Sequence, residues 1–576
     1  MSSPDPAPTA RSMAEILRAR ADQSPDALAF AWLADGIEDG PRFTYADLDR
    51  EARAVAVALR DVAEPGDRAL LVFAPGLEFV AGFFGCLYAG LVPVPAYPPR
   101  LDRLAQGWQA LAAVAADCGP RVVLTGGLAA DHVAAGAGRL SAMRVVTDAV
   151  DRASAGRWRE TPVDPDAVAV LQYTSGSTAA PKGVMVTHRS LMHNQAMILA
   201  AFEHDGPGGG VCWLPPYHDM GLVGGLLQTV YHGAWSRLMS PVALLQDPFR
   251  WLAAISRHRA DTSGGPNFAY DFCARRVTPE QRATLDLSTW SVVAIGSEPI
   301  SAETMDRFAE TFETCGFRRE AFCPCYGLAE ATLLVTSRPK GEPPAVLSVS
   351  AAALEDGQAL PAAAGEAARQ LVGCGRSWLG QEVRVVDPEA CTALPDGRIG
   401  EIWVRGESVA AGYWSRPEET ERTFRARLAD IGAGPYLRTG DLGFVRGGEL
   451  FVTGRIKDVI IVRGRNHYPQ DIEETVQAVH PALRPGCGAA FEETRDGRPG
   501  VVVVQEVDRR GRGLDARQLL ADARQAVAER HEVQLHDLRL LEYGSIPKTS
   551  SGKVRRHACR LEYARDGLRL WKENRA

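Results

Sequence analysis

A loop of small and hydroxyl-bearing residues between a buried strand and a helix constrains this chain more than any other segment. The apolar run 167–171 is typical of a buried strand, and Thr187 is suited to cap a helix that continues to residue 199. The loop reads Leu-Gln-Tyr-Thr-Ser-Gly-Ser-Thr-Ala-Ala-Pro-Lys-Gly over residues 171–183. Its small residues expose backbone N–H groups, which together with Lys182 suit a polyphosphate. The alternative is a flexible turn at the surface.

Helical and strand-like segments alternate around this loop. Helical spacing of apolar residues covers 12–20, 45–60 and 79–89, and strand-like runs cover 68–73, 121–125, 144–147, 211–216 and 290–295. This alternation predicts an α/β fold with mainly parallel sheets. Residues 337–370, rich in Ala, Pro, Gly and Glu, are interpreted as an insertion that forms a hairpin with a short helix.

The pattern changes twice towards the C-terminus. Short strands at 382–387, 400–405 and 450–453 predict a small β unit. A compact α+β unit then follows, with helices at 469–479 and 515–531 and strands at 500–507 and 537–541. We place the boundary near Lys457, which gives an N-terminal domain of residues 1–456 and a C-terminal domain of residues 457–576.

Composition excludes several classes of protein. The net charge of −7 gives no sign of a nucleic-acid binder. Eleven cysteines without paired CxxC spacing predict free thiols in a reducing cytoplasm. Residues 79–99 carry no charge and are long enough to span a bilayer, but their glycines and prolines favour a helix, a turn at Gly90 and a short strand. We therefore expect a cytoplasmic protein without a membrane span.

Further segments carry residues that are suited to binding or catalysis, and each of these residues also has a purely structural interpretation. His218 belongs to an acid/base or metal fragment, or to the start of a helix. Glu330, in a turn with an aromatic residue and a glycine, suits a flat ring and Mg²⁺, or lies solvated at a helix N-terminus. Asp441 suits the two hydroxyls of a ribose, or forms a turn. The loop 546–553 carries two lysines that can reach a phosphate or carboxylate, or begins a solvated basic tail.

In their order and spacing, these segments resemble the core motifs of the adenylate-forming superfamily, which includes acyl-CoA synthetases, fatty acyl-AMP ligases and peptide-synthetase adenylation domains. The resemblance extends from about Met13 to the last basic stretch. It implies a large N-terminal adenylating domain of several subdomains with parallel sheets and a small β unit, and a small mobile α+β C-terminal domain.

The resemblance also implies a reaction and a role for individual residues. The carboxylate of a fatty acid would attack the α-phosphorus of ATP, and Lys553 with Mg²⁺ would offset the repulsion between the two anions. Lys553 and Glu330 would be catalytic, with Glu330 holding Mg²⁺, and Lys457 would be the hinge. The binding residues implied are Thr174, Ser175, Gly176, Ser177, Thr178 and Lys182 for the phosphates, Ser297, Glu298, Pro299, Tyr326 and Gly327 for adenine, Asp441 and Arg455 for ribose, and His218 and Gly221 for the acyl substrate.

Three features resemble fatty acyl-AMP ligases in particular. They are the segment Pro-Pro-Tyr-His-Asp-Met-Gly-Leu at 215–222 with Ala-Tyr-Pro-Pro-Arg at 96–100, the insertion at 337–370, and Arg463 where CoA ligases usually have glycine. The resemblance implies that the acyl group passes to the phosphopantetheine thiol of an acyl carrier protein on a separate chain, in polyketide or lipopeptide synthesis. The basic residues Arg555 and Arg556 offer a docking surface for such a carrier.

Two alternatives remain open at this point. The first is a fatty acyl-CoA synthetase, which shares the adenylation motifs. The second is a non-catalytic adenylate-binding protein, although a degenerate relative is expected to lack at least one of Lys182, Glu330, Asp441 and Lys553, and all four are present.

Overall fold

The structure is a computed structural model that describes residues 10–99, 104–131, 133, 142–174, 181–203, 208–462, 465–495, 498–509, 514–549 and 553–571. Four of the implied phosphate-binding residues (Ser175, Gly176, Ser177 and Thr178) lie outside these ranges, as does Arg463. Thr174 ends a strand, and only its backbone is described.

A four-stranded parallel sheet and four α-helices, one of them α4 (Leu104–Cys118), form the described part of the N-terminal region. The strands β3 (Arg68–Val72), β4 (Val92–Ala96), β5 (Val122–Thr125) and β6 (Met143–Val146) lie in the order β4-β3-β5-β6. Helices α1 (Met13–Gln23) and α2 (Tyr45–Arg60) begin at side-chain caps, Ser12 and Thr44. Helix α3 (Leu77–Ala89) ends at Gly90, whose φ of +76° suits a left-handed cap. No helix within the described residues is both long and apolar enough to cross a bilayer.

An eight-stranded sheet forms the centre of the molecule. Its order is β14-β13-β12-β11-β9-β10-β1-β2, with bounds Leu28–Leu33 (β1), Asp39–Thr44 (β2), Gly209–Cys212 (β9), Trp235–Met239 (β10), Thr262–Gly265 (β11), Val292–Ile295 (β12), Phe322–Gly327 (β13) and Leu334–Ser337 (β14). The six inner strands run parallel and the two edge strands antiparallel. Within this sheet, strand β1 from the N-terminal part of the chain pairs parallel with β10, which is distant in sequence.

Different helices cover the two faces of this sheet. On one face, α9 (Phe249–His258), α10 (Asn267–Arg276) and α12 (Ala302–Phe312) enclose an aromatic core around Trp251, Tyr270 and Trp290. On the other face lie α6 (His188–Phe202), the π-helix η6 (Met220–Leu227) and α7 (Gln228–His232), which share a core with α2 and α3. The carboxyl ends of the parallel strands point towards the site described below.

Two antiparallel strands flank residues 175–180, which differs from the strand, loop and helix expected from the sequence. Strands β7 (Val168–Thr174) and β8 (Lys182–Thr187) pair antiparallel, with Thr174 opposite Lys182. Residues 182–187 form a second strand because they pair with β7 on one side and bridge to Tyr413 on the other. Thr187 caps α6 through a reciprocal hydrogen bond with Ser190, as the sequence predicted.

The small β unit is an antiparallel meander of β17 (Glu382–Val386), β18 (Gly400–Arg405), β19 (Leu437–Arg446) and β20 (Glu449–Arg455), with α14 (Pro417–Phe424) beside it. The insertion folds as β15 (Val346–Ser350), α13 (Ala351–Glu355) and β16 (Ala368–Val372), a hairpin with a short helix. We call residues 346–372 the insertion hairpin. Its apolar side packs on Phe444 and Phe451 of the meander and on Tyr468 beyond it.

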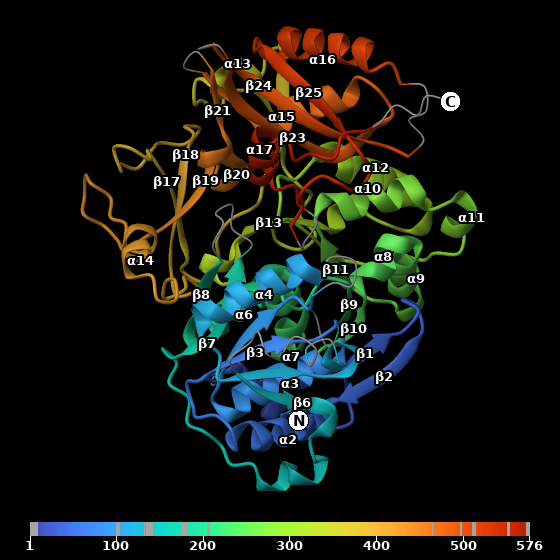
Figure 1. Cartoon of the computed structure of the whole chain (residues 1–576), viewed down its shortest axis with the longest axis vertical. Helices are drawn as coiled ribbons and strands as arrows, with labels where there is room; N and C mark the ends of the chain where they lie inside the picture. Colours follow the sequence, from blue (N-terminus) through green and yellow to red (C-terminus); the bar gives the residue numbers. More distant parts are fainter. Residues whose placement is uncertain are drawn as a thin grey trace.

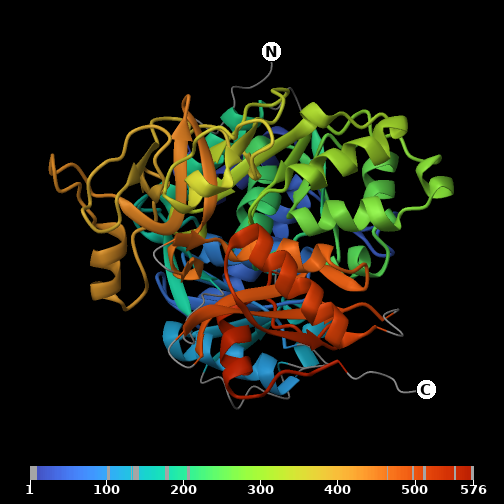
Figure 2. The ribbon, with the colours of Figure 1, turned by 90° about the horizontal axis from the view of Figure 1, so that it is seen from above.

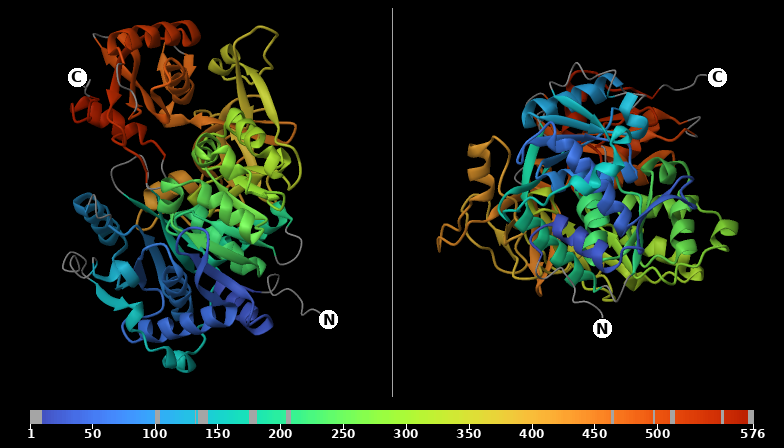
Figure 3. Two further views of the ribbon diagram at one scale, coloured as in Figure 1. Left: turned by 90° about the vertical axis from the view of Figure 1, so that its right-hand side faces the viewer. Right: turned by 90° about the horizontal axis from the view of Figure 1, so that it is seen from below.

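The C-terminal unit lies above the rest of the chain in Figure 1, and Figure 2 shows it from above. It starts at η10 (Ile456–Asp458) and contains β21 (Ile460–Val462), β22 (Arg465–His467), α15 (Pro469–Ala478), β23 (Leu483–Arg495), β24 (Arg498–Val507), α16 (Ala516–His531), β25 (Leu535–Leu541) and α17 (Arg556–Ala564). Apolar residues of α15, α16 and the sheet β23-β24-β25 form a core within this unit. The insertion hairpin stands beside it in the left view of Figure 3.

Candidate active site

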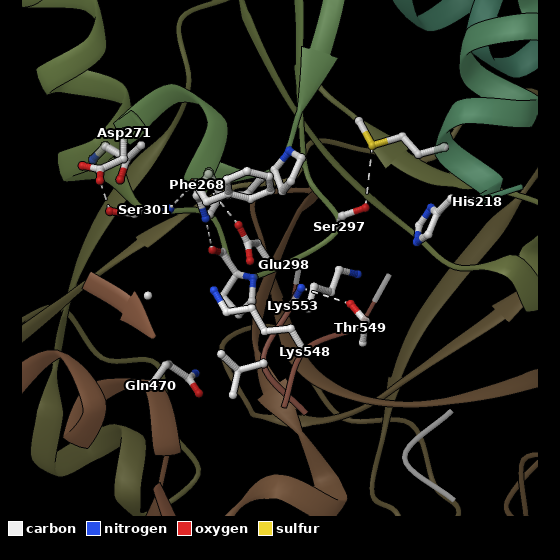
Figure 4. Close-up of a pocket in the computed structure, with 18 of the residues that line it drawn as sticks. His218, Phe268, Asp271, Ser297, Glu298, Ser301, Gln470, Lys548, Thr549 and Lys553 are labelled. Atoms are coloured by element: carbon white, nitrogen blue, oxygen red, sulfur yellow. Dashed lines mark hydrogen bonds between the residues drawn. The ribbon is translucent and has the colours of Figure 1, made fainter. Parts of the chain in front are cut away.

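A cavity of about 4010 Å³ opens between the C-terminal unit and the carboxyl ends of the central sheet. Of the implied site residues with described side chains, all line it except Gly221. Figure 4 shows part of this cavity, with Lys548, Thr549 and Lys553 approaching Glu298, Ser297 and His218. Residues from seven separate stretches of the chain thus converge on one space.

Lys182 and Glu330 are connected through residues of the small β unit. Lys182 forms an ion pair with Glu419 of α14, and its ammonium lies 5.2 Å from the centre of the Tyr413 ring. The Tyr413 hydroxyl donates a hydrogen bond of 2.8 Å to Glu330 Oε1. The contact with Lys182 lowers the pKa of Glu419. A basic group suited to phosphate and an acidic group suited to a cation therefore face one part of the cavity.

Glu330 is half-buried, so the solvated alternative for this residue is wrong. It lies in a short 3₁₀ turn after β13, where burial raises its pKa and the hydrogen bond from Tyr413 opposes that rise. The described residues contain no group of three or more His, Cys, Asp or Glu that could bind a metal. One carboxylate still fits Mg²⁺, which protein sites usually bind through one or two carboxylates, water and substrate phosphates.

Tyr326, Asp441 and Arg455 form a hydrogen-bonded triad in which Asp441 is only 5% exposed. The Tyr326 hydroxyl donates to Asp441 Oδ2 at 2.8 Å, and Arg455 Nε lies 2.8 Å from Asp441 Oδ1. Asp441 sits on strand β19 opposite Arg455 of β20, so it does not form a turn. The triad fixes a carboxylate that retains lone pairs for further donors, such as hydroxyl groups.

The segment after β12 places Ser297 and Glu298 at the cavity, and its backbone conformation at Ser297 is unusual. Ser297 has a φ of +72°, which is rare for a residue with a side chain and recurs at functional sites. Its hydroxyl contacts Met220 Sδ at 3.6 Å. Glu298 Oε1 accepts a hydrogen bond of 3.4 Å from the Phe268 backbone N–H, and burial raises its pKa.

Lys553 comes from the C-terminal unit and enters the cavity near two carboxylates. Lys553 makes two hydrogen bonds with Thr549: the Thr549 N–H donates to the Lys553 carbonyl at 2.7 Å, and the Lys553 N–H donates to the Thr549 hydroxyl oxygen at 3.0 Å. Burial lowers the pKa of Lys553, while the negative charges of Asp219 and Glu298 oppose that change. His218 Nδ1 lies 2.7 Å from Asp219 Oδ1, and Asp219 also accepts from the first N–H of η6.

Two sequence interpretations need correction. Gly221 does not line the cavity; it lies behind it, where a Cβ would be 2.1 Å from the Pro215 carbonyl oxygen, so glycine is explained by close backbone packing. Arg556 does not belong to a solvated tail. Its guanidinium donates to both oxygens of the buried Glu473, at 2.6 and 2.8 Å, and so attaches α17 to α15.

Sequence reasoning missed three residues of the site, Asp219, Tyr413 and Glu419. Asp219 was interpreted as part of an acid/base or metal fragment with His218, or as the start of a helix, and was not assigned to the site. The segment that holds Tyr413 and Glu419 carries a visible signal, Pro417 followed by two acidic residues, but this pattern indicates only the start of a helix. Their contacts with Glu330 and Lys182 join distant parts of the chain.

Two family models match the chain. The model described as AMP-binding enzyme matches residues 17–414, and the model described as Disco-interacting protein 2-like, AMP domain, matches residues 457–573. Together they extend over both the region of the central sheet and the C-terminal unit.

Similar proteins match over nearly their whole length. The chain is 44% identical over 573 residues to the medium-chain-fatty-acid–(acyl-carrier-protein) ligase JamA of Moorena producens, covering 98% of this chain and 97% of that protein. It is 40% identical over 582 residues, 96% and 98% of the two chains, to fadD21 of Mycobacterium leprae, whose name assigns it provisionally to the fatty-acid–CoA ligases. A crystal structure of a fatty acyl-adenylate ligase from L. pneumophila, in complex with acyl adenylate and pyrophosphate, is 38% identical with a TM-score of 0.76, covering 99% of both chains.

Proposed function

Because the chain belongs to the AMP-binding enzyme family and resembles fatty acyl-AMP ligases within it, we propose that it activates a medium- or long-chain fatty acid with ATP. The products are an acyl adenylate and pyrophosphate. In a second step, the acyl group passes to the phosphopantetheine thiol of an acyl carrier protein on a separate chain. JamA, the relative named above, is by its name a ligase of this kind.

The meeting of Lys553 with Asp219 and Glu298 in the shared cavity is the observation that carries this proposal. Adenylate formation joins two anions, a carboxylate and a triphosphate, so the reaction needs a cation at the point where they meet. Lys553 supplies one from the C-terminal unit. The ammonium stabilises charge as the carboxylate oxygen attacks the α-phosphorus and pyrophosphate leaves.

The other residues hold the substrates in position for this attack. Asp441 accepts hydrogen bonds from the ribose hydroxyls while Tyr326 and Arg455 hold its carboxylate still. Lys182 leaves Glu419 to bind the β- and γ-phosphates. Glu330 and the phosphate oxygens would hold Mg²⁺, which supplies positive charge to the polyphosphate when bound. Such pre-organised positioning accounts for much of the rate of a reaction that needs little proton transfer.

The choice of acceptor depends on how the C-terminal unit is held. Transfer requires Lys553 to withdraw so that a thiol can reach the adenylate, and Lys457 in η10 is the hinge we propose for this rotation. The insertion hairpin restrains the unit: Arg369 Nε is 3.1 Å from Asp471, and Glu355 Oε1 is 3.2 Å from His467 Nδ1. A carrier protein can bind to the C-terminal unit itself. Restraint of this unit therefore favours a carrier protein over free CoA as the acyl acceptor.

Product analysis tests this function. The purified chain is incubated with ATP, Mg²⁺ and radiolabelled dodecanoic acid, alone, with CoA, or with a phosphopantetheinylated acyl carrier protein. We expect acyl-AMP to accumulate without acceptor or with CoA, and acyl carrier protein to become labelled. Rapid acyl-CoA formation would identify a CoA synthetase instead, and no adenylate from fatty acids of any length would overturn the proposal. Lys553→Ala is the matched control, because an unchanged adenylation rate in it would remove Lys553 from the mechanism.

A further inference from the structure

One buried glutamine of the cavity has no hydrogen-bond partner for either polar atom among the residues that the structure describes. Gln228 is 6% exposed, and both its Nε2 and its Oε1 are buried and unpaired. Two other buried glutamines are each anchored through their Nε2: Gln172 donates to Tyr217 O at 3.0 Å, and Gln195 donates to Val223 O at 3.1 Å, although the Oε1 of both is also unpaired. Gln228 is thus not anchored by the fold, although buried amides almost always are.

Gln228 lines a part of the cavity that we call the inner arm, whose walls come from α6, β9 and α7 rather than from the segments that carry the nucleotide-site residues. It is the first residue of α7 and directly follows the π-helix η6. The arm is bounded by Ile198 and Phe202 of α6, by Cys212 of β9 and by the α7 residues that follow Gln228. Apart from those α7 residues, these walls are largely apolar, which suits a hydrocarbon chain but gives an amide nothing to bind.

The distance from the reactive end of the site matches a medium-length chain. His218, which lines the same cavity, precedes Gln228 by ten residues, which at about 1.5 Å per helical residue corresponds to about 15 Å along the helix axis. An extended carbon chain covers about 1.2 Å per bond, a third of the span of an extended peptide residue. About a dozen carbons therefore reach from the carboxylate position to Gln228.

An ordinary fatty acid would leave this amide unpaired, and a substrate with a hydroxyl group at the same depth would not. A hydroxyl both donates and accepts, so it can pair with Oε1 and with Nε2 at once. Sites with buried polar groups discriminate strongly against analogues that lack the matching group, because the site is then left unsatisfied.

We propose that Gln228 is a specificity residue for an acyl chain that bears a hydroxyl or oxo group about ten to twelve carbons from the carboxylate. The substrate class is then an oxygenated medium-chain fatty acid. This inference rests on the proposed function, because it places an acyl chain in the inner arm of the cavity. The π-helix before Gln228 is a local irregularity of a kind that occurs frequently at functional sites.

The test compares paired substrates in pyrophosphate exchange: 12-hydroxydodecanoic with dodecanoic acid, and 10-hydroxydecanoic with decanoic acid. For the wild-type chain, we expect kcat/KM to favour the hydroxy acid of at least one pair by about 10- to 100-fold. Gln228→Leu should abolish or reverse this preference. Gln195→Leu is the matched control and should keep the preference.

Each result has a distinct meaning. Because both acids of a pair are measured on one preparation, partial unfolding of a variant cancels in the ratio. Equal kcat/KM for both members of each pair, or a preference that survives Gln228→Leu, would overturn the role of Gln228 and leave the fatty acid ligase function intact. No adenylate from any of the four acids would overturn the proposed function together with this inference.

Discussion

Replacing Arg369 with methionine should loosen the C-terminal unit from the insertion hairpin. Arg369 lies on β16, where its Nε is 3.1 Å from Asp471 Oδ1 and its Nη2 donates to Thr453 O at 3.3 Å. Its guanidinium also lies over the Tyr468 ring, 4.9 Å from the centroid. Methionine retains most of the apolar stem but removes the charge and every donor.

The size of the effect follows from the exposure of the pair. The side chains of Arg369 and Asp471 are 15% and 25% exposed. The free energy lost on breaking their ion pair therefore lies between that of a surface pair, at most about 1 kcal/mol, and that of a buried pair, about 3–5 kcal/mol. We take about 2 kcal/mol, which changes the equilibrium between docked and released unit by roughly 30-fold. Burial raises the pKa of Asp471 and Arg369 opposes that rise, so the substitution also favours the neutral carboxyl group.

The assay measures pyrophosphate exchange and acyl-CoA formation with dodecanoic acid. We expect Arg369→Met to leave exchange unchanged, since Arg369 contacts Asp471, Thr453 and Tyr468 rather than the nucleotide residues, and to raise acyl-CoA formation by up to about 30-fold. Asp471→Asn and the double variant complete a mutant cycle, which should show strong coupling between the two positions. Additive effects without any rise in acyl-CoA would refute the reasoning that this contact restrains the unit.

Three further substitutions test the nucleotide site. Asp441→Asn keeps the shape of the side chain but removes the charge that pairs with Arg455. Because a hydrogen bond to a charged group contributes about 1.5–3 kcal/mol, the KM for ATP in pyrophosphate exchange should rise by about 10- to 100-fold. An unchanged KM would contradict the assignment of Asp441 to the ribose. Burial lowers the pKa of Lys553 below 10.5, so adenylation should fall as pH rises through that lowered pKa and the ammonium loses its charge. Lys553→Arg should move this alkaline limb upward, because a guanidinium stays charged, and a limb that stays in place belongs to another group. Glu419→Gln removes the partly exposed ion pair that holds Lys182, which contributes about 1 kcal/mol. Pyrophosphate should therefore bind up to about fivefold more tightly in calorimetry. Weaker binding would mean that Glu419 positions Lys182.

Segments with strong local signals could be predicted closely from the sequence. Helix α2 covers residues 45–60 and strand β18 covers 400–405, as their patterns predicted, because a capping box marks the start of α2 and β18 is a short apolar run between two charged residues. Strands β1, β10 and β8 were not predicted. Their conformation depends on partners that are distant in sequence, and a short apolar run alone does not distinguish a strand from a helix.

The residues of the site also divide into those with a local sequence signal and those without one. The motif residues from Lys182 to Lys553 were recognised because each belongs to a local pattern that resembles a family motif, and the structure brings those with described side chains together, apart from Gly221. Tyr413, Glu419 and Gln228 were not recognised. Two of them act through contacts across the fold, and the third is distinguished only by the absence of a hydrogen-bond partner, which no sequence pattern records.

The pairing of β1 with β10 sets the timing of folding during synthesis. Roughly 200 residues separate the two strands, and at about 5–20 residues per second a ribosome needs about 10–40 s to make them. For that period the apolar strand Leu28–Leu33 has left the ribosome without the neighbour that completes its parallel pairing. The nascent chain therefore depends on its charged hairpin partner β2, or on a chaperone, to remain soluble. For the same reason, a deletion that removes the first 33 residues takes a strand out of the central sheet.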